Sequence, residues 1–494
     1  MSGQHAVRVP WELPVILAFQ AAFTIPLILH RAVYGDEALY IWAGHLEIDH
    51  WLHGRAIPAL AGYFSGAPVV YPPLDALTGS LAGARLLSCC FMLGTTTLLW
   101  VTARHLRDRV TATAAAALFV TLYSTMHLGS FATFDAMSLF LLALAAFFAV
   151  KAAEGNQWWA AAAAAALITA NAAKYASILW DPVVVCIAVL HKADSRPART
   201  SVERGALIAA CWAAAAAALL GLGGKPYLHG LMATTLSRAA GTEPALAVLW
   251  HAFQWVGAVV VLALAGLVCS IARHEPRSRI WLTGVLAAAG LLAPLNEARI
   301  HTLISLGKHV GFGAWFAAIA AGYAVSCALS WLAARFPRRA LLAGSCAALA
   351  VPLLGVGAVQ ASATGGESHS AYLAERLRAM ITRSHDQELI LVDTPELTHL
   401  YPPLLPVSDW KVARGAHVLS SDLPLITTNL GLIQDRKFTI IVLRFRGLVR
   451  EQDLQYRSAL QRTHAYRFTG TVSPSGGGAG RFFIWQLRSN GGEQ

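Results

Sequence analysis

Two adjacent carboxylates, Asp36 and Glu37, follow the first long apolar stretch of the chain, in the sequence Gly-Asp-Glu-Ala-Leu-Tyr over residues 35–40. A carboxylate beside a substrate hydroxyl or amine can remove its proton as a general base. Acidic residues also favour the first turn of a helix, so the same pair could simply begin a helix at a membrane surface. Which interpretation holds depends on where the chain places this pair.

Other ionisable residues at the edges of apolar stretches are few, and such residues are candidates for function because they are costly near a membrane. Cations could hold a departing phosphate as its negative charge grows. Simpler roles are an N-cap for Asp135, a snorkelling side chain for Lys174 and ordinary loop charges for the rest. The set is Asp135, Lys174, Arg299, His301, Lys308 and His309.

The composition indicates a polytopic membrane protein. Of 494 residues, 56% are hydrophobic and 13% are charged, and the mean hydropathy is +0.52. A soluble protein of this length would carry about 25% charged residues. The net charge of +11 comes from Lys and Arg in short loops between apolar runs, which the positive-inside rule explains and a nucleic-acid-binding face does not.

Runs of about 17–25 apolar residues are long enough to span a bilayer. The first run has no obvious cleavage site, so it is interpreted as an uncleaved span and not as a signal peptide. Several runs are dominated by alanine, so the sequence does not define sharply where these spans begin and end. We expect eleven transmembrane helices near 12–30, 82–103, 110–128, 134–152, 157–173, 175–191, 205–223, 246–272, 279–295, 309–333 and 340–361.

Four basic clusters, after the second, sixth, eighth and tenth spans, predict the orientation. With a cytoplasmic N-terminus all four fall on the cytoplasmic side. The same topology sends the long loop 31–81, the turn at 174, residues 296–308 and everything after 362 to the outer face. We therefore predict a multi-pass plasma-membrane protein whose acids and bases, drawn from distant segments, converge on the outer face.

Two domains are expected. Residues 1–362 would form the transmembrane domain with the loop 31–81, whose amphipathic stretch suits a helix at the interface. Residues 363–494 would form a small extracytoplasmic α/β domain, joined by a linker at 363–368. Its predicted elements are a helix at Ser370–Ser384, strands at Leu389–Val392, Phe438–Leu443 and Phe482–Leu487, and a flexible loop at 474–480.

No cofactor follows from the sequence, and a divalent metal requirement is left open. All seven cysteines lie in apolar runs, so neither a disulfide framework nor a Cys-based metal site is indicated. A metal could instead bind His45, His50 and His53 with Asp49. We favour solvated interface residues for this group.

The order of several motifs resembles the protein-mannosyltransferase and aminoarabinose-transferase group of the C-type membrane glycosyltransferases. The motifs are Gly-Asp36-Glu37-Ala-Leu-Tyr after the first span, Tyr71-Pro72-Pro73 before the second, Thr-Phe-Asp135-Ala at the fourth and Ala-Lys174-Tyr175-Ala after the fifth. The resemblance covers residues 10–190, and the later spans are similar mainly in layout.

This resemblance implies an inverting glycosyltransferase that uses a dolichyl- or polyprenyl-phosphate-linked sugar. The catalytic carboxylate would be Asp36, with Glu37 beside it, and Asp135 would support substrate binding. Substrate would also meet Tyr71, Pro72, Lys174, Tyr175, Arg299, His301, Lys308 and His309. The acceptor would be a protein, lipid or glycan.

Three departures from the group's pattern leave the substrate and the phosphate-holding cations open. Leu39-Tyr40 replaces an aromatic pair, Tyr71 replaces a histidine before the two prolines, and Arg299-Ile-His301 replaces an arginine, aromatic and proline pattern.

Two other functions compete with the enzyme. A transporter or flippase would place its site near the bilayer midplane between repeated halves, whereas the charges here gather at one surface and no internal repeat is evident. A sensor or assembly scaffold would leave the acidic residues without a role. The sequence therefore favours the glycosyltransferase.

Overall fold

In the computed structural model the chain divides into two compact units, residues 1–29 with 47–364, and residues 30–46 with 365–494. The structure describes residues 11–335 apart from 32, 58–59, 63, 236 and 239, then residues 355–361 and parts of 373–488. The predicted domain boundary at 362 lies outside the described residues.

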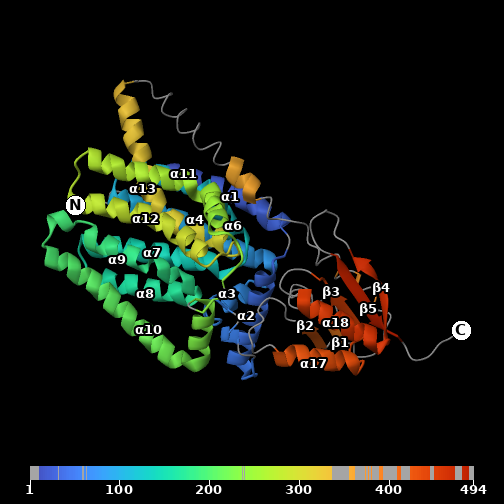
Figure 1. Cartoon of the computed structure of the whole chain (residues 1–494). Helices are drawn as coiled ribbons and strands as arrows, with labels where there is room; N and C mark the ends of the chain where they lie inside the picture. The colour runs from blue at the N-terminus through green and yellow to red at the C-terminus, as the bar shows by residue number, and fades with distance from the viewer. Residues whose placement is uncertain are drawn as a thin grey trace. The chain divides into compact units, whose positions relative to one another are not determined.

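The first unit is a bundle of long helices (Figure 1). Helix α2 begins in the second unit. The helices are α1 (Glu12–His30), α2 (Gly35–His53), η1 (Leu60–Gly62), α3 (Tyr71–Leu77), α4 (Leu81–Leu106), α5 (Arg109–Val120), α6 (Tyr123–Ser130), α7 (Phe134–Glu154), α8 (Trp158–Ala173), η2 (Tyr175–Trp180), α9 (Asp181–Leu190), η3 (Ala193–Ser195), α10 (Ala198–Thr234), α11 (Ala245–Ala272), α12 (Arg277–Arg299) and α13 (Leu306–Arg335).

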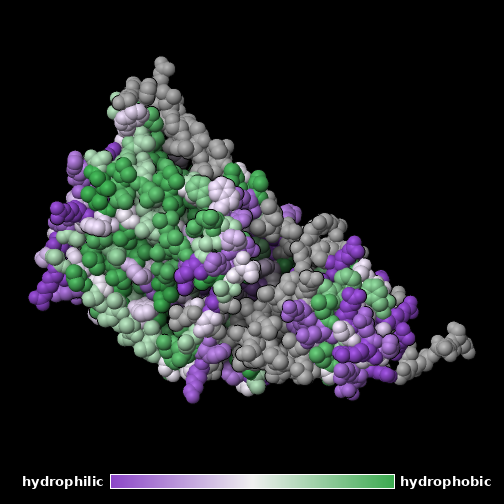
Figure 2. Space-filling view, viewed as in Figure 1, coloured by the Kyte–Doolittle hydropathy of each residue, from purple (hydrophilic) through white to green (hydrophobic). Residues whose placement is uncertain are grey.

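Within the described residues, eight helical segments are long and apolar enough to cross a membrane. The α5–α6 pair, bent by 66°, would be a ninth as one broken span, and α8 is a shorter apolar helix. Apolar side chains cover much of the visible surface of this unit (Figure 2). The predicted polytopic helical class is confirmed, but the described residues do not reach the predicted count of eleven. The 110–128 span is two helices, the 157–173 span is the shorter helix α8, and the 340–361 span lies mostly outside the described residues.

Alanine-rich helices pack closely at the centre of the bundle. The α7 residues Ala143 and Ala146 and the α8 residues Ala160 and Ala163 are fully buried. Small side chains let helix backbones approach one another in membrane proteins. The start of α7 and the end of α8, which carry candidate site residues, are therefore held by tight packing.

Helix α10 bends at Gly224, whose backbone angles (φ 64°, ψ −163°) interrupt the helix. Glycine adopts this left-handed φ without the steric cost that a Cβ would bring. The predicted span 205–223 ends at this bend, and residues 225–234 continue as a separate helical segment.

The second unit contains a five-stranded mixed sheet in the order β2-β1-β3-β5-β4 (Figure 1). Strands β2, β1 and β3 are parallel, and β3, β5 and β4 are antiparallel. The elements are β1 (Leu389–Val392), β2 (Asp409–Val412), α17 (Leu423–Gln434), β3 (Ile440–Leu443), α18 (Arg450–Thr463), β4 (Tyr466–Val472) and β5 (Phe482–Leu487).

The α/β class predicted for the C-terminal region is confirmed, as are strands β1, β3 and β5. Strands β2 and β4 were not predicted because neither is a short apolar run: β4, for example, buries only its two ends. The predicted linker 363–368 and loop 474–480 lie outside the described residues, and the helix 370–384 lies largely outside them.

Candidate functional site

A buried carboxylate at the start of α7 is shared by two lysines from distant segments. The Asp135 Oδ1 atom lies 2.5 Å from Lys174 Nζ, and Asp135 Oδ2 lies 3.8 Å from Lys308 Nζ. Asp135 is fully buried, and the Lys174 and Lys308 side chains are 4% and 13% exposed. The structure thus brings together three of the residues that the sequence singled out.

The simpler interpretations of Asp135 and Lys174 do not hold. Thr133 occupies the N-cap position of α7, so Asp135 is not the N-cap. Lys174 does not snorkel: its ammonium is buried, ion-paired and 4.8 Å from the centre of the Phe134 ring. The Lys174–Asp135 pair is therefore internal.

A polar network in the α8–η2 turn holds Lys174. Ser177 Oγ donates to the Lys174 carbonyl (2.9 Å) and to Asn171 Oδ1 (2.5 Å), and Asn171 Nδ2 donates to Asp181 Oδ2 (2.6 Å). All these side chains are buried. The turn predicted at 174 is present, but its buried Asp181 was not anticipated because it lies within an apolar run.

The end of the long 31–81 loop packs against the same turn. The Ala67 amide donates to the Ala172 carbonyl (2.6 Å), and the Tyr175 amide donates to the Ser65 carbonyl (2.9 Å). A Cβ on Gly66 would lie 2.0 Å from the Ala173 carbonyl oxygen, so only glycine fits there. This loop segment is therefore fixed beside Lys174.

Glu297 and His309 form a second buried pair where α12 ends and α13 begins. His309 Nδ1 lies 2.5 Å from Glu297 Oε1, and the two side chains are 7% and 0% exposed. His309 follows Lys308 directly in the sequence, so this pair ties the first turn of α13 to α12. Glu297 was not predicted as a site residue, since only its burial distinguishes it from an ordinary loop charge.

Arg299 and His301 make their hydrogen bonds away from Asp135. The exposed Arg299 donates to Asn296 Oδ1 (3.1 Å), and His301 Nδ1 is 2.8 Å from the Glu243 carbonyl. The adjoining Gly241 amide donates to the Ile300 carbonyl (2.8 Å). Substrate binding by Arg299 and His301 stays a prediction.

Tyr175 is 4% exposed, and its ring meets Tyr227 of the α10 end segment edge-on at 5.7 Å. Burial raises the pKa of Tyr227, so its phenol stays protonated. Tyr175 is thus packed inside the protein against Tyr227, and its contact with substrate stays a prediction.

The Tyr71-Pro72 motif begins helix α3. Proline is favoured at the first helical positions because its missing N–H would be unpaired there anyway. Both residues are buried, and the Tyr71 hydroxyl donates to Asp75 Oδ1 (3.0 Å). A packing role accounts for these contacts, and contact with substrate stays a prediction.

Asp36 and Glu37, the adjacent carboxylates after the first apolar stretch, differ in their surroundings. Glu37 is fully buried and its Oε2 accepts from the Tyr34 amide (2.8 Å), which is the backward hydrogen bond of a capping box. Asp36 is half-buried at the start of α2. The helix-capping alternative thus describes Glu37, and the catalytic roles predicted for both acids are untested.

The histidine-rich end of α2 forms surface ion pairs. Asp49 Oδ1 lies 2.8 Å from His53 Nδ1, and Asp49 Oδ2 lies 3.0 Å from Arg55 Nη1. Across the described residues, no group of three or more His, Cys, Asp and Glu is arranged to hold a metal.

Comparisons with known proteins support the predicted resemblance. Residues 76–220 match the family model for dolichyl-phosphate-mannose-protein mannosyltransferases. ArnT from Cupriavidus metallidurans, solved with undecaprenyl phosphate, is 15% identical with a TM-score of 0.61, covering 98% of this chain and 99% of that one. An Archaeoglobus fulgidus oligosaccharyltransferase, tethered to an acceptor peptide, is 12% identical with a TM-score of 0.55, covering 98% and 74%. No curated protein matches the sequence.

The chain has the fold of the C-type membrane glycosyltransferases. A mycobacterial arabinofuranosyltransferase, AftD, also matches, at 15% identity and a TM-score of 0.52, and this chain spans 41% of its length. In this C-type fold the present chain carries its own buried pairs, Asp135 with Lys174 and Lys308, and Glu297 with His309.

Proposed function

We propose that this protein is an integral membrane glycosyltransferase that moves a sugar from a polyprenyl-phosphate donor to an acceptor at the outer face, with inversion at the anomeric carbon. The observation that carries the proposal is the Asp135 carboxylate held by Lys174 and Lys308, at the helix ends of a C-type fold. The undecaprenyl phosphate in ArnT and the dolichol phosphate in the archaeal oligosaccharyltransferase support this donor class.

In the proposed step Asp36 takes the proton from the acceptor hydroxyl or amine as that atom attacks the anomeric carbon. The bond from this carbon to the phosphate oxygen breaks, and its electron pair leaves on the lipid phosphate. Lys308 stabilises the growing negative charge. Of the two lysines it lies farther from Asp135 and is more exposed, so it is the better placed to meet an external anion.

The carboxylate assignment is tested in cells that lack the protein. Such cells should accumulate one polyprenyl-phosphate sugar, which mass spectrometry of their lipid extract would identify. Wild-type protein should clear this lipid, whereas Asp36→Asn should not, because asparagine cannot accept the proton. Equal membrane abundance and equal thermal midpoints of the two proteins are the control. Clearance at the wild-type rate by Asp36→Asn would refute the assignment of the base.

A transporter or flippase is the competing function, and detergent solution separates the two. An enzyme should join sugar to acceptor in micelles, using the accumulated lipid as donor, because the reaction needs no sealed compartment. A transporter should leave the donor unchanged in micelles and move it only across the bilayer of a vesicle.

A further inference from the structure

An apolar groove of about 490 Å³ lies between α11 and α13, towards the end of the bundle where both helices finish. Its wall is made almost wholly of aliphatic side chains, small residues and two thiols. The main contributors are Leu262, Cys269 and Arg273 from α11 with its cap, and Cys327, Trp331 and Leu332 from α13.

Arg273 is the one charged residue among those that line the described groove. It is exposed and occupies the C-cap of α11, where the partial negative charge of the helix end favours a cation. No carboxylate lies within ion-pair distance of it in the part of the chain that the structure describes. Its side-chain neighbours are the uncharged Tyr323, Cys269 and Cys327, so no described acid neutralises its positive charge and it can attract an anion to the mouth of the groove.

The neighbouring acid, Glu275, is already neutralised. Arg107 Nη1 donates to both of its carboxylate oxygens at 2.7 Å, and the Tyr323 hydroxyl donates to Oε1 at 2.9 Å. Ser270 Oγ also donates to this carboxylate. Glu275 is thus engaged elsewhere and does not cancel the positive charge of Arg273.

Trp331 stands 53% exposed beside the same end of the groove. Tryptophan prefers the level of the lipid headgroups, where its ring is half in hydrocarbon and its N–H meets water. An apolar groove with an arginine and a tryptophan at its mouth therefore matches a phospholipid: acyl chain inside, phosphate at the mouth.

We propose that the groove between α11 and α13 binds an anionic phospholipid of the adjacent leaflet, with an acyl chain along the groove and the phosphate on Arg273. Basic pockets between transmembrane helices recognise anionic headgroups in this way. A polar solute is a poor fit because, apart from Arg273 and the Trp331 N–H at the mouth, the groove offers only weakly polar thiols. This site is independent of the sugar-transfer proposal and lies on different residues.

The test titrates phosphatidylglycerol into the full-length protein in detergent and reads retained lipid by native mass spectrometry. Arg273→Gln should weaken phosphatidylglycerol binding about fivefold, which corresponds to one basic side chain at an anionic headgroup. It should leave phosphatidylcholine binding nearly unchanged, since that headgroup carries no net charge. Ala328→Trp, at an exposed groove position, should reduce the binding of both lipids by filling the groove.

Arg277→Gln is the matched control, because Arg277 is an exposed arginine at the start of α12 that does not line the groove. It should bind phosphatidylglycerol as the wild type does. Equal losses for Arg273→Gln and Arg277→Gln would mean unspecific attraction to basic loops and would overturn the proposal. Unaltered lipid binding by Ala328→Trp, or full competition by inorganic phosphate, would also overturn it, since then no acyl chain occupies the groove.

Discussion

At the scale of single residues, Lys174 and Lys308 share one carboxylate, but we expect substitution of each lysine to have a different effect on the protein. Lys174 is the closer and more buried partner of Asp135. Removing one partner of a buried ion pair leaves an uncompensated charge and costs about 3–5 kcal/mol. Lys174→Gln is therefore expected to lower the thermal midpoint of the purified protein sharply.

Lys308→Gln should instead weaken lipid-phosphate binding, because Lys308 is the longer-range and more exposed partner. A hydrogen bond to a charged group contributes about 1.5–3 kcal/mol, so undecaprenyl phosphate should bind about tenfold to a hundredfold less tightly. Native mass spectrometry would give the affinity and thermal unfolding the stability. If both variants lost stability and affinity to the same extent, this division of roles would be wrong.

The pair Asp36 and Glu37 illustrates why the choice of Asp36 as base rested on the resemblance and not on residue types. Both acids stand in the first turn of α2, and both interpretations, capping and catalysis, use a carboxylate there. The backward hydrogen bond to the Tyr34 amide engages Glu37 and buries it, while Asp36 stays half-buried. The two acids therefore differ in burial, and the choice of Asp36 as base stays a prediction that rests on the resemblance.

At the scale of elements, the turn that carries Lys174 depends on a close backbone contact at Gly66. Gly66→Ala would place a Cβ 2.0 Å from the Ala173 carbonyl oxygen, so the loop must move. Overpacking of this kind costs about 1–3 kcal/mol. The variant is expected to melt earlier and to lose donor clearance more than its stability loss explains, because Ser65 and Ala67 hold the 172–175 segment.

Gly155→Ala is the matched control for this change. A Cβ there meets nothing within 4 Å, and the backbone angle φ of 168° is extended. It should leave both the thermal midpoint and donor clearance near their wild-type values. An equal effect of the two substitutions would show that the Gly66 contact does not position the turn.

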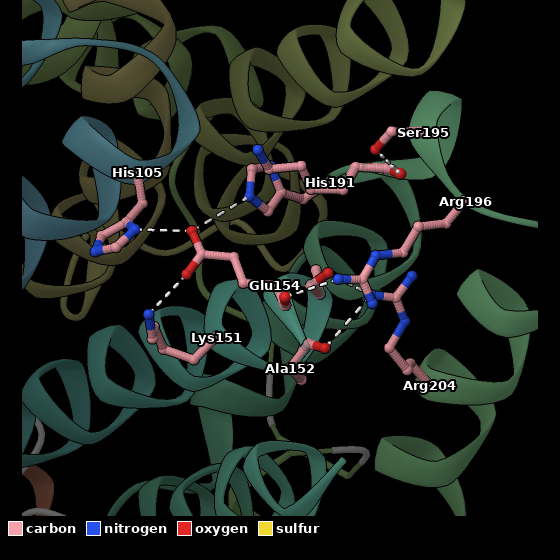
Figure 3. Close-up of polar contacts among 10 residues, drawn as sticks. His105, Lys151, Ala152, Glu154, His191, Ser195, Arg196 and Arg204 are labelled. Atoms are coloured by element: carbon pink, nitrogen blue, oxygen red, sulfur yellow. Dashed lines mark hydrogen bonds and ion pairs between the residues drawn. The ribbon is translucent and has the colours of Figure 1, made fainter. Parts of the chain in front are cut away.

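The other end of α7 is held by a separate polar cluster (Figure 3). Glu154 lies between His105 Nδ1 (2.8 Å) and Lys151 Nζ (2.7 Å), while Arg204 donates to the Ala153 carbonyl (2.7 Å) and Arg196 to the Glu154 carbonyl (2.7 Å). The arginines thus satisfy carbonyl groups that a helix C-terminus leaves unpaired.

Arg204→Met is expected to destabilise the bundle by about 1–3 kcal/mol, because it leaves buried carbonyl groups without donors. The rate of transfer per folded molecule should not change, since α7 separates this cluster from Asp135 by about 30 Å. Thermal unfolding and donor turnover in detergent would measure the two effects. Arg199→Met, at a side chain that is 88% exposed, should alter neither, and a specific loss of turnover in Arg204→Met would contradict the separation of the two ends.

At the scale of the whole molecule, the sequence predicted the features that follow directly from hydropathy and from the distribution of charge. The lengths of the apolar runs predicted most of the membrane spans, and short apolar runs predicted strands β1, β3 and β5. Three ionisable residues, Asp135, Lys174 and Lys308, meet as their shared membrane edge suggested. Glu297 and Asp181 were not assigned because a buried acid inside or beside an apolar run differs from a loop charge only through its neighbours in space. Strands β2 and β4 were not predicted because their sequences mix polar and apolar residues without an apolar run.

The orientation of the chain is a property of the whole molecule that rests on its basic loops. If these loops are cytoplasmic and the chain has the eleven spans predicted from its sequence, we expect the C-terminal α/β unit to be extracytoplasmic. A cysteine at Ser458, exposed on α18, should react with a membrane-impermeant maleimide on intact cells. A cysteine at Ser195, exposed near the basic segment 192–204, should react only after permeabilisation. The parent chain, whose cysteines all lie in apolar runs, gives the background. The reverse labelling pattern would invert the topology and move the proposed transfer site to the cytoplasmic face, where the accumulated donor would have to be sought instead.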